Sequence, residues 1–228
     1  ARLDYKKGPY SASEGDFASA GSAAITYANR LARNVATASI GQDGYARTAL
    51  AASNEIDGGV LTYALEALHN DGPYTHPDDY QKLNGVLRYS RGYANNGWSV
   101  TAMAYRGRWN ATDQIPERAV AAGRLGRFDA VDTTDGGEAK RFSLSGVWRR
   151  TGQDSASKVS AYVIRNQLDL WSDFTYFMND PVNGDQFAQP DRRVTSGVNA
   201  THSWHVHRGE TSTSDITVGL EAQNDNIF

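Results

Sequence analysis

The residues best suited to metal chemistry are three histidines close together near the C-terminal end of the sequence. They are His202, His205 and His207. Side chains of an extended strand alternate between its two faces, so His205 and His207 share one face and His202 lies on the other. Two imidazoles on one face can bind a metal ion, but no third ligand is evident beside them. We therefore predict a solvated strand end here and no metal site.

A second group of candidates is a run of carboxylates and aromatic side chains within residues 169–191. Carboxylate oxygens suit hard cations, yet the spacing of an EF-hand loop is absent, so a solvated loop is the simpler interpretation. Aromatic side chains exposed on a loop of a rigid scaffold commonly contact ligands, and we predict such a contact here. The carboxylates are Asp169, Asp173, Asp180, Asp185 and Asp191, and the aromatic residues are Trp171, Phe174, Tyr176 and Phe177.

Enzyme chemistry finds no support in the sequence. The chain contains no Cys, which excludes a thiolate nucleophile, a disulfide framework and a cysteine zinc site. It also lacks Gly-x-Ser-x-Gly, His-Glu-x-x-His and a phosphate-binding loop, motifs that carry hydrolytic or nucleotide chemistry. We expect no catalytic residues and no cofactor.

Composition narrows the class of protein further. The 228 residues carry 23 Lys+Arg against 26 Asp+Glu, a net charge of −3, whereas nucleic-acid binders usually have a basic excess. No uninterrupted apolar run of about 20 residues is present, which excludes a protein that crosses a membrane with helices. Membrane barrels remain possible, because only alternate residues of their strands face lipid.

From residue 34 onward the chain alternates with period two, which predicts strands. In residues 194–206, apolar Val198 and Trp204 alternate with polar Asn199 and Ser203. Several segments reach about 11–14 residues, longer than the usual soluble strand and close to a tilted strand that crosses an outer membrane. We predict about nine strands, at 34–41, 45–53, 59–68, 82–92, 97–109, 139–150, 156–168, 192–206 and 212–223.

The connections between these strands alternate between long and short. In an up-and-down meander every second connection lies at the same end, so this rhythm is typical of an outer-membrane barrel with short periplasmic turns and long extracellular loops. A Greek-key sandwich has no reason to show it. The long connections are 69–81, 110–138 and 169–191, and the short ones are 93–96, 152–155 and 207–211. We predict a transmembrane antiparallel up-and-down β-barrel in residues 32–228.

Aromatic residues near the predicted strand ends agree with a membrane location. Amphipathic rings favour the two membrane–water interfaces, where they form girdles. The residues concerned are Trp98, Trp109, Trp148, Trp171, Trp204, Tyr45, Tyr93 and Tyr105.

Residues 1–31 differ from the rest because they lack long alternation and contain turn signals such as Gly8-Pro9. We expect a compact, turn-rich element packed against something larger. The string Lys-Gly-Pro-Tyr-x-Ala-x-x-Gly-Asp-Phe-x-x-Ala-Gly at residues 7–21 resembles the stretch near the end of the plug domain in TonB-dependent outer-membrane receptors. It covers about 15 residues, and the remainder of the chain is similar in architecture alone. The motif residues are Lys7, Gly8, Pro9, Tyr10, Gly15, Asp16, Phe17, Ala20 and Gly21.

The resemblance implies an architecture. Residues 1–31 would be the C-terminal end of a plug that sits inside the barrel, followed by the first barrel strand running outward. The connections after strands three, five and seven would then be extracellular, and these are the three long ones. A receptor of this kind has a 22-stranded barrel, so the chain would be an internal part of a longer receptor. Plug and wall would pair through Glu66, Arg88, Glu221, Arg30 and Arg33.

The resemblance also implies a function in the bacterial outer membrane. Such a receptor binds a scarce extracellular ligand, a ferric siderophore or another large nutrient, and imports it with energy transmitted by TonB, whose contact segment would lie outside this sequence. Other partners would be outer-membrane lipids and lipopolysaccharide. Loop arginines could contact an anionic ligand or surface lipopolysaccharide, but balance of nearby carboxylates is the simpler interpretation. The arginines are Arg118, Arg124 and Arg127, beside Asp129, Asp132 and Asp135. The alternatives are an outer-membrane porin or passive channel, and a soluble secreted β-sandwich that binds or hydrolyses carbohydrate.

Overall fold

The computed structural model describes residues 2–8, 19–93, 95–208 and 212–228. These residues form β-strands almost throughout, together with one five-residue helix, α1 (Glu117–Ala121). No helix in the described part of the chain is long and apolar enough to cross a membrane. The all-β class predicted from the sequence is confirmed.

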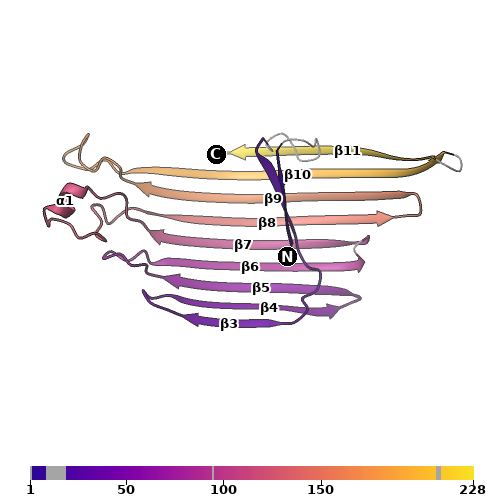
Figure 1. The fold of residues 1–228 in the computed structure, drawn as a ribbon, viewed down its shortest axis with the longest axis horizontal. Helices are drawn as coiled ribbons and strands as arrows, with labels where there is room; N and C mark the ends of the chain where they lie inside the picture. The colour runs from indigo at the N-terminus through magenta and orange to yellow at the C-terminus, as the bar shows by residue number, and fades with distance from the viewer. Residues whose placement is uncertain (1, 9–18, 94, 209–211) are drawn as a thin grey trace.

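Nine strands form one antiparallel sheet in which neighbours in space are neighbours in sequence (Figure 1). The sheet is open, because β3 and β11 are its two edges. All nine predicted strands are confirmed, most of them with longer ends than predicted. They are β3 (Val35–Ile40), β4 (Ala46–Ile56), β5 (Gly59–Asn70), β6 (Tyr80–Tyr93), β7 (Asn96–Asn110), β8 (Gly136–Thr151), β9 (Ser155–Ser172), β10 (Phe187–Arg208) and β11 (Ser212–Ile227).

The tight turns follow from local sequence. Asp57 and Gly58, which join β4 to β5, have φ angles of 50° and 72°. Positive φ at both central residues is the geometry of a type I′ hairpin turn, whose twist matches that of the flanking strands. Glycine reaches this region without steric cost, and aspartate tolerates it better than most residues. The Asp-Gly pair therefore determines where β4 ends and β5 begins.

The long connections all lie at one end of the sheet, on the left in Figure 1. They comprise residues 71–79, 111–135 and 173–186, while 57–58 and 152–154 lie at the opposite end. The alternation predicted from the sequence is confirmed. Each long loop is shorter than predicted because the flanking strands extend beyond their predicted ends.

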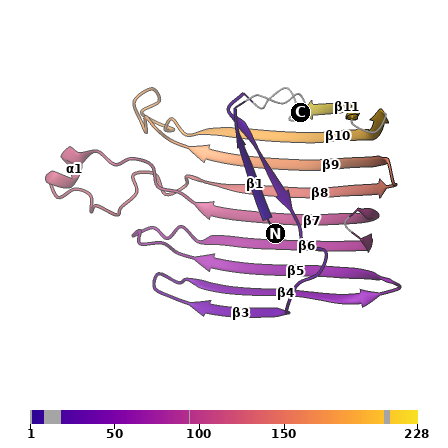
Figure 2. The same ribbon diagram turned by 45° about the vertical axis from the view of Figure 1, so that its right-hand side comes forward.

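The N-terminal residues form a separate two-stranded hairpin of β1 (Arg2–Lys7) and β2 (Gly21–Thr26). It lies across the large sheet in both views (Figures 1 and 2). A compact, turn-rich element was expected here from the sequence, and the strands β1 and β2 were not predicted. The first half of β2 consists of small residues that show no apolar–polar alternation, and the two strands pair only with each other, for example Leu3 with Ile25.

The large sheet is a single layer. Among the described residues no large side chain is completely buried, whereas two stacked sheets about 10 Å apart would bury their inner faces. Many large apolar side chains are exposed, among them Leu65 at 57% and Leu220 at 66%. The described strands therefore do not build a β-sandwich core.

Candidate functional site

The strand register divides the sheet into two faces of different chemistry. Leu65, Gly85, Ala104 and Phe142 are successive partners across β5 to β8 and share one face. We call this the apolar face; it also carries Leu50, Leu61, Tyr63, Leu83, Leu87, Val100, Leu144, Val159, Val163, Val198 and Leu220. The other face, called the polar face, carries Arg47, Thr62, Glu66, Arg88, Thr101, Ser145, Asn199, Thr201 and Glu221.

The apolar side chains form a band that crosses the strands obliquely. Leu50 of β4 lies in the same cross-strand row as Asn226 of β11. The apolar side chains of β11, at Ile216, Val218 and Leu220, are displaced toward the tight-turn end. The displacement is about eight residues at ~3.3 Å each, over about seven strand spacings of ~4.8 Å. The strands are therefore tilted by roughly 40° against the band. Strands of outer-membrane barrels are tilted by about 35–45°.

Aromatic side chains follow the tight-turn edge of this band. Trp98 and Trp148 are direct register partners on β7 and β8, and the Tyr89 ring lies 5.4 Å from the Trp98 ring. On β10 the Trp204 ring lies 4.2 Å from that of His202. This row of aromatic residues on the apolar face is the arrangement that the girdle hypothesis requires at this end.

Two residues of the predicted girdle lie elsewhere. Trp109 and Tyr105 occupy odd positions of β7, and these belong to the polar face. Trp109 covers Gly137, where a Cβ would lie 2.6 Å from Trp109 Cζ2. They therefore do not share the face of Trp98 and Trp148, and the period-two alternation of β7 is the signal that separates them.

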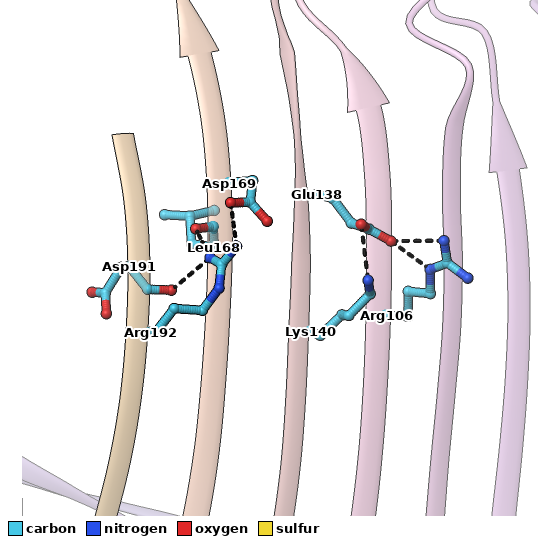
Figure 3. Close-up of polar contacts among 7 residues, drawn as sticks. All are labelled: Arg106, Glu138, Lys140, Leu168, Asp169, Asp191 and Arg192. Carbon is cyan, nitrogen blue, oxygen red and sulfur yellow. Dashed lines mark hydrogen bonds and ion pairs between the residues drawn. The ribbon is translucent and has the colours of Figure 1, made fainter. Parts of the chain in front are cut away.

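At the long-loop end the apolar face carries charged side chains (Figure 3). Glu138 Oε1 accepts from Arg106 Nε at 2.7 Å, and its Oε2 lies 2.9 Å from Lys140 Nζ. On β9 and β10, Arg192 Nη2 lies 2.5 Å from Asp169 Oδ1. We call the cations of this edge the cationic row; they are Arg106, Arg108, Lys140, Arg165 and Arg192, accompanied by the carboxylates Asp79, Glu138 and Asp169.

The segment after β2 contacts the polar face. Arg88 Nη2 donates to Asn29 Oδ1 at 2.9 Å, and Thr62 Oγ1 donates to Asn29 O at 2.8 Å. Leu31 N donates to Ser53 Oγ at 3.0 Å. These contacts hold the N-terminal segment against polar side chains contributed by β4, β5 and β6.

The predicted pairs between this segment and the sheet exist in part. Arg88 contacts Asn29, and Arg30 forms an ion pair with Glu55. Glu66 instead lies between two neighbours in the sheet, Arg47 and Lys82. Within the described part of the chain, neither Arg33 nor Glu221 forms an ion pair.

The described part of the plug-like motif closes the N-terminal hairpin. Lys7 pairs with Gly21 in register, and Gly8 N donates to Ala20 O at 3.0 Å. At Gly21, with φ of +146°, a Cβ would lie 2.3 Å from Lys6 O, so the position demands glycine. Five motif residues lie outside the described residues: Pro9, Tyr10, Gly15, Asp16 and Phe17.

Two of the long loops dock on one another. Asp173 N donates to Asp113 Oδ2 at 3.2 Å, and Tyr176 Oη donates to the carbonyl oxygen of Gln114. Gln186 Nε2 donates to Asp135 Oδ1 at 3.1 Å. The loops 111–135 and 173–186 are therefore joined by direct contacts at the long-loop end of the sheet.

The predicted ligand-contact residues fall into two groups. Phe174 and Phe177 are exposed at 57% and 58%, whereas Tyr176 is half-buried in the loop contact. Trp171 is exposed but lies in β9, so its assignment to the loop is wrong. The sequence analysis missed two apolar side chains that extend this surface, Met178 and Val182. Their exposure depends on how the loop folds back.

Asp135 has an unusual environment beneath these loops. Its side chain is only 2% exposed. Burial raises the pKa of the Asp135 carboxyl to about 6, and the neighbouring carboxyls of Asp113 and Asp132 act in the same direction while Gln186 acts against them. Its Oδ2 has no hydrogen-bond partner in the described part of the structure. The loop contact thus contains a carboxyl whose pKa is raised well above its usual range.

The histidines lie as the alternation predicted. His205 and His207 share the polar face with ring centroids 4.7 Å apart, and His202 lies on the apolar face beside Ser157. Asp215 Oδ1 is 2.5 Å from His205 Nδ1.

One other group of described residues has metal-ligand chemistry. His69, Asp71 and Asp79 place ligand atoms within 4.8 Å of one another. The Arg108 guanidinium lies 3.0 Å from Asp79 Oδ2, and Gln81, Arg108 and His69 together lower the pKa of the Asp79 carboxyl. A cation already neutralises this group, which weakens the case for a metal ion there.

The loop arginines do not form the predicted ion pairs. Among the described residues, no salt bridge joins Arg118, Arg124 or Arg127 to a carboxylate. Asp129 instead accepts from Gly126 N at 2.6 Å. In the described part of the chain, Asp129, Asp132 and Asp135 therefore do not balance these arginines through direct ion pairs.

No family model, curated protein or solved structure matches this chain. The features that bear on its function are the two faces of the sheet, the N-terminal segment and the loops.

Proposed function

We propose that this chain is the end of the plug and the first part of the barrel of a TonB-dependent receptor in the bacterial outer membrane. The observation that carries the proposal is the oblique apolar band on one face of the sheet, opposite a polar face that holds the N-terminal segment. The plug-like motif at residues 7–21 points to the same family.

The dimensions of the band support a membrane-crossing sheet. On β8, Lys140 and Arg150 lie on the apolar face and bracket its apolar segment. They are about ten residues apart, which is ~33 Å along the strand and ~25 Å across the band at the tilt given above. The lipid-facing band of an outer-membrane barrel is about 25 Å tall.

The polar face supports a filled interior. A barrel wall that encloses a polar plug needs polar side chains on its inner side, and each buried group needs a partner. Asn29 and Leu31 find such partners in Arg88, Thr62 and Ser53. An open channel gives no reason for these contacts, which is why a receptor is favoured over a porin.

The long loops support recognition of an extracellular ligand. They gather at the end of the sheet where the first strand arrives, and they expose Phe174, Phe177 and Met178. Exposed aromatic side chains on anchored loops suit a bulky ligand with apolar parts. We propose a ferric siderophore or a nutrient of similar size, imported with energy from TonB.

Uptake measurements in the source cells test this proposal. The probe is the siderophore fraction of an iron-starved culture of the same cells, loaded with ⁵⁵Fe. We expect deletion of the gene to remove uptake of one component, and a protonophore to stop its uptake while leaving surface binding intact.

Two outcomes would favour the alternatives. Uptake of small solutes that continues after protonophore treatment would indicate a passive channel. Recovery of the native protein in the soluble fraction without detergent would contradict the membrane location. It would favour a secreted carbohydrate-binding protein instead.

A further inference from the structure

Two histidines lie near the end of β10, at the opposite end of the sheet from the long loops (Figure 1). Strand β9 begins at Ser155, which pairs with Trp204. Beyond Trp204, β11 is the only strand that pairs with β10 in the described part of the chain. His205 and His207 therefore lie on the polar face of a two-stranded ribbon, and both side chains are exposed.

The two imidazole rings are close enough to share one metal ion. Their centroids lie 4.7 Å apart, and their planes are inclined at 81°. Zinc binds imidazole nitrogen at about 2.0–2.1 Å with tetrahedral geometry, which places the centroids of two bound rings roughly 5 Å apart. The separation of the His205 and His207 rings is close to this value.

Strand pairing adds a carboxylate to the two imidazoles. No third group is evident beside them in the sequence, but Asp215 of β11 is the direct register partner of His205. Its Oδ1 lies 2.5 Å from His205 Nδ1. A carboxylate that accepts from one ring nitrogen orients the imidazole and leaves the other nitrogen available to a metal ion. Asp215 thus positions His205 with its Nε2 available for a metal ion.

The ligand atoms at this site are not occupied by other protein groups. Among the described residues, His205 has its one hydrogen-bond or ion-pair partner in Asp215, and His207 has none. The His205 side chain is 43% exposed and that of Asp215 is 77% exposed. A metal ion can therefore reach the site from solvent without any rearrangement of the strands.

Other histidines of the chain have less suitable surroundings. His202 lies on the apolar face, where its Nδ1 is 2.7 Å from Ser157 Oγ. Beside His69, the Asp79 carboxylate is already paired with the Arg108 guanidinium. These two histidines therefore serve as internal controls for the pair on β10.

We propose that His205 and His207 bind one divalent transition-metal ion, Zn²⁺ fitting best, and that Asp215 is the positioning residue of this site. Imidazole nitrogen is a preferred ligand of Zn²⁺, and water completes the coordination shell. The bound ion stabilises the end of a two-stranded ribbon, a structure that is only marginally stable by itself. The inference goes beyond the proposed function and does not depend on it, because the site lies at the other end of the sheet from the long loops.

Chemical modification of the whole native protein tests the inference. The protein is freed of metal with a chelator and treated with diethyl pyrocarbonate, which modifies accessible imidazoles, with or without excess Zn²⁺. Mass spectrometry of the peptides then locates the modified residues. By mass action, we expect Zn²⁺ to slow modification of His205 and His207 by about tenfold or more. Modification of His202 should be unaffected.

Variants separate the two ligands from the positioning residue. The Zn²⁺ concentration that gives half-maximal protection of His205 measures the affinity of this site alone. His207→Gln should abolish the protection of His205, whereas His202→Gln, on the opposite face of the same strand, should leave the affinity unchanged. Asp215→Ala should lower the affinity by about 10- to 100-fold. Asp215→Asn keeps an oxygen that accepts from Nδ1 and should restore part of this loss.

The inference is overturned if His205 and His207 are modified equally fast with and without Zn²⁺. Protection of His69 alone would also overturn it, because the ion would then bind beside Asp71 and Asp79. Equal affinity in Asp215→Ala and the unaltered protein would remove the positioning role of Asp215. Failure of the proposed function looks different: uptake of the labelled ligand would be absent while Zn²⁺ still protected His205 and His207.

Discussion

The Arg88 guanidinium of β6 reaches two groups that lie far apart in sequence. Its Nη2 donates to Asn29 Oδ1 at 2.9 Å, and its Nη1 donates to Thr101 Oγ1 at 2.7 Å. One side chain thus joins the N-terminal segment to the wall formed by β6 and β7. Arg88 is therefore the residue whose loss should release that segment first.

Replacing Arg88 by Met should loosen residues 27–34 while the sheet remains intact. Hydrogen bonds to charged groups contribute roughly 1.5–3 kcal/mol when partly shielded from water, so amide exchange in this segment should accelerate by about tenfold or more. Hydrogen exchange followed by mass spectrometry measures this. Arg141→Gln, on the same face but without a partner among the described residues, is the matched control. Equal acceleration in both variants would show that Arg88 does not anchor the segment.

Leu144 and Ser145 are adjacent in sequence but lie on opposite faces of β8. If the apolar face meets lipid, Leu144→Arg should destabilise the protein by about 2–4 kcal/mol, the cost of a cation near the bilayer midplane. Ser145→Arg, on the polar face, should cost much less. Denaturant titration of the protein in lipid bilayers compares the two. A smaller loss of stability for Leu144→Arg than for Ser145→Arg would contradict contact between the apolar face and lipid.

The contact between the long loops should weaken as pH rises through about 6. The folded-state pKa of Asp135 is raised above 3.8, so the protonated carboxyl is favoured when the loops are docked. The protonated Asp135 carboxyl contributes fully to the stability of the loop contact below about pH 4, and this contribution is lost as pH rises through about 6. Its upper limit is about 3 kcal/mol. The carboxyls of Asp113, Asp132 and Asp173 and the Tyr176 hydroxyl face the same site.

Hydrogen exchange in the loops 111–135 and 173–186, corrected for intrinsic rates, tests this at about pH 4.5 and 7.5. The Asp135→Asn variant removes the titration but keeps an oxygen for Gln186, so its protection should change little with pH. Asp185, whose pKa is lowered to about 2 by hydrogen bonds from Thr175 and Asn179, stays ionised at both pH values. An unchanged pH dependence in Asp135→Asn would assign the effect to another group.

Phe177 should contribute to ligand affinity without contributing to the fold. Its ring is exposed, so Phe177→Ala creates no core cavity. Loss of an aromatic contact at an interface commonly costs about 1–2 kcal/mol, roughly 5–30-fold in affinity. Equilibrium binding of the ⁵⁵Fe-labelled siderophore fraction to whole cells measures it. Val131→Ala, at an exposed apolar residue of the loop 111–135, is the control. Unchanged affinity would remove Phe177 from the ligand surface.

The sequence by itself determined the local features of this protein. Period-two alternation marked every strand of the large sheet and assigned His205 and His207 to one face, because side-chain direction along a strand depends only on position. Asp57-Gly58 forms its turn for an equally local reason, since both residues adopt positive φ angles. The same pattern did not reveal β1 and β2, because β2 begins with the small residues Gly21-Ser22-Ala23-Ala24, which show no apolar–polar alternation, and β1 pairs only with β2.

Only the tertiary structure decided what depends on lateral register. Alternation states which face a side chain occupies but not which residue lies opposite it on the next strand, since pairing joins residues far apart in sequence. The register placed Leu50 in line with Asn226 and so made the apolar band oblique. It also brought Gly85 beside Ala104, between Leu65 and Phe142, and the fold of the loops buried Asp135 under Gln186.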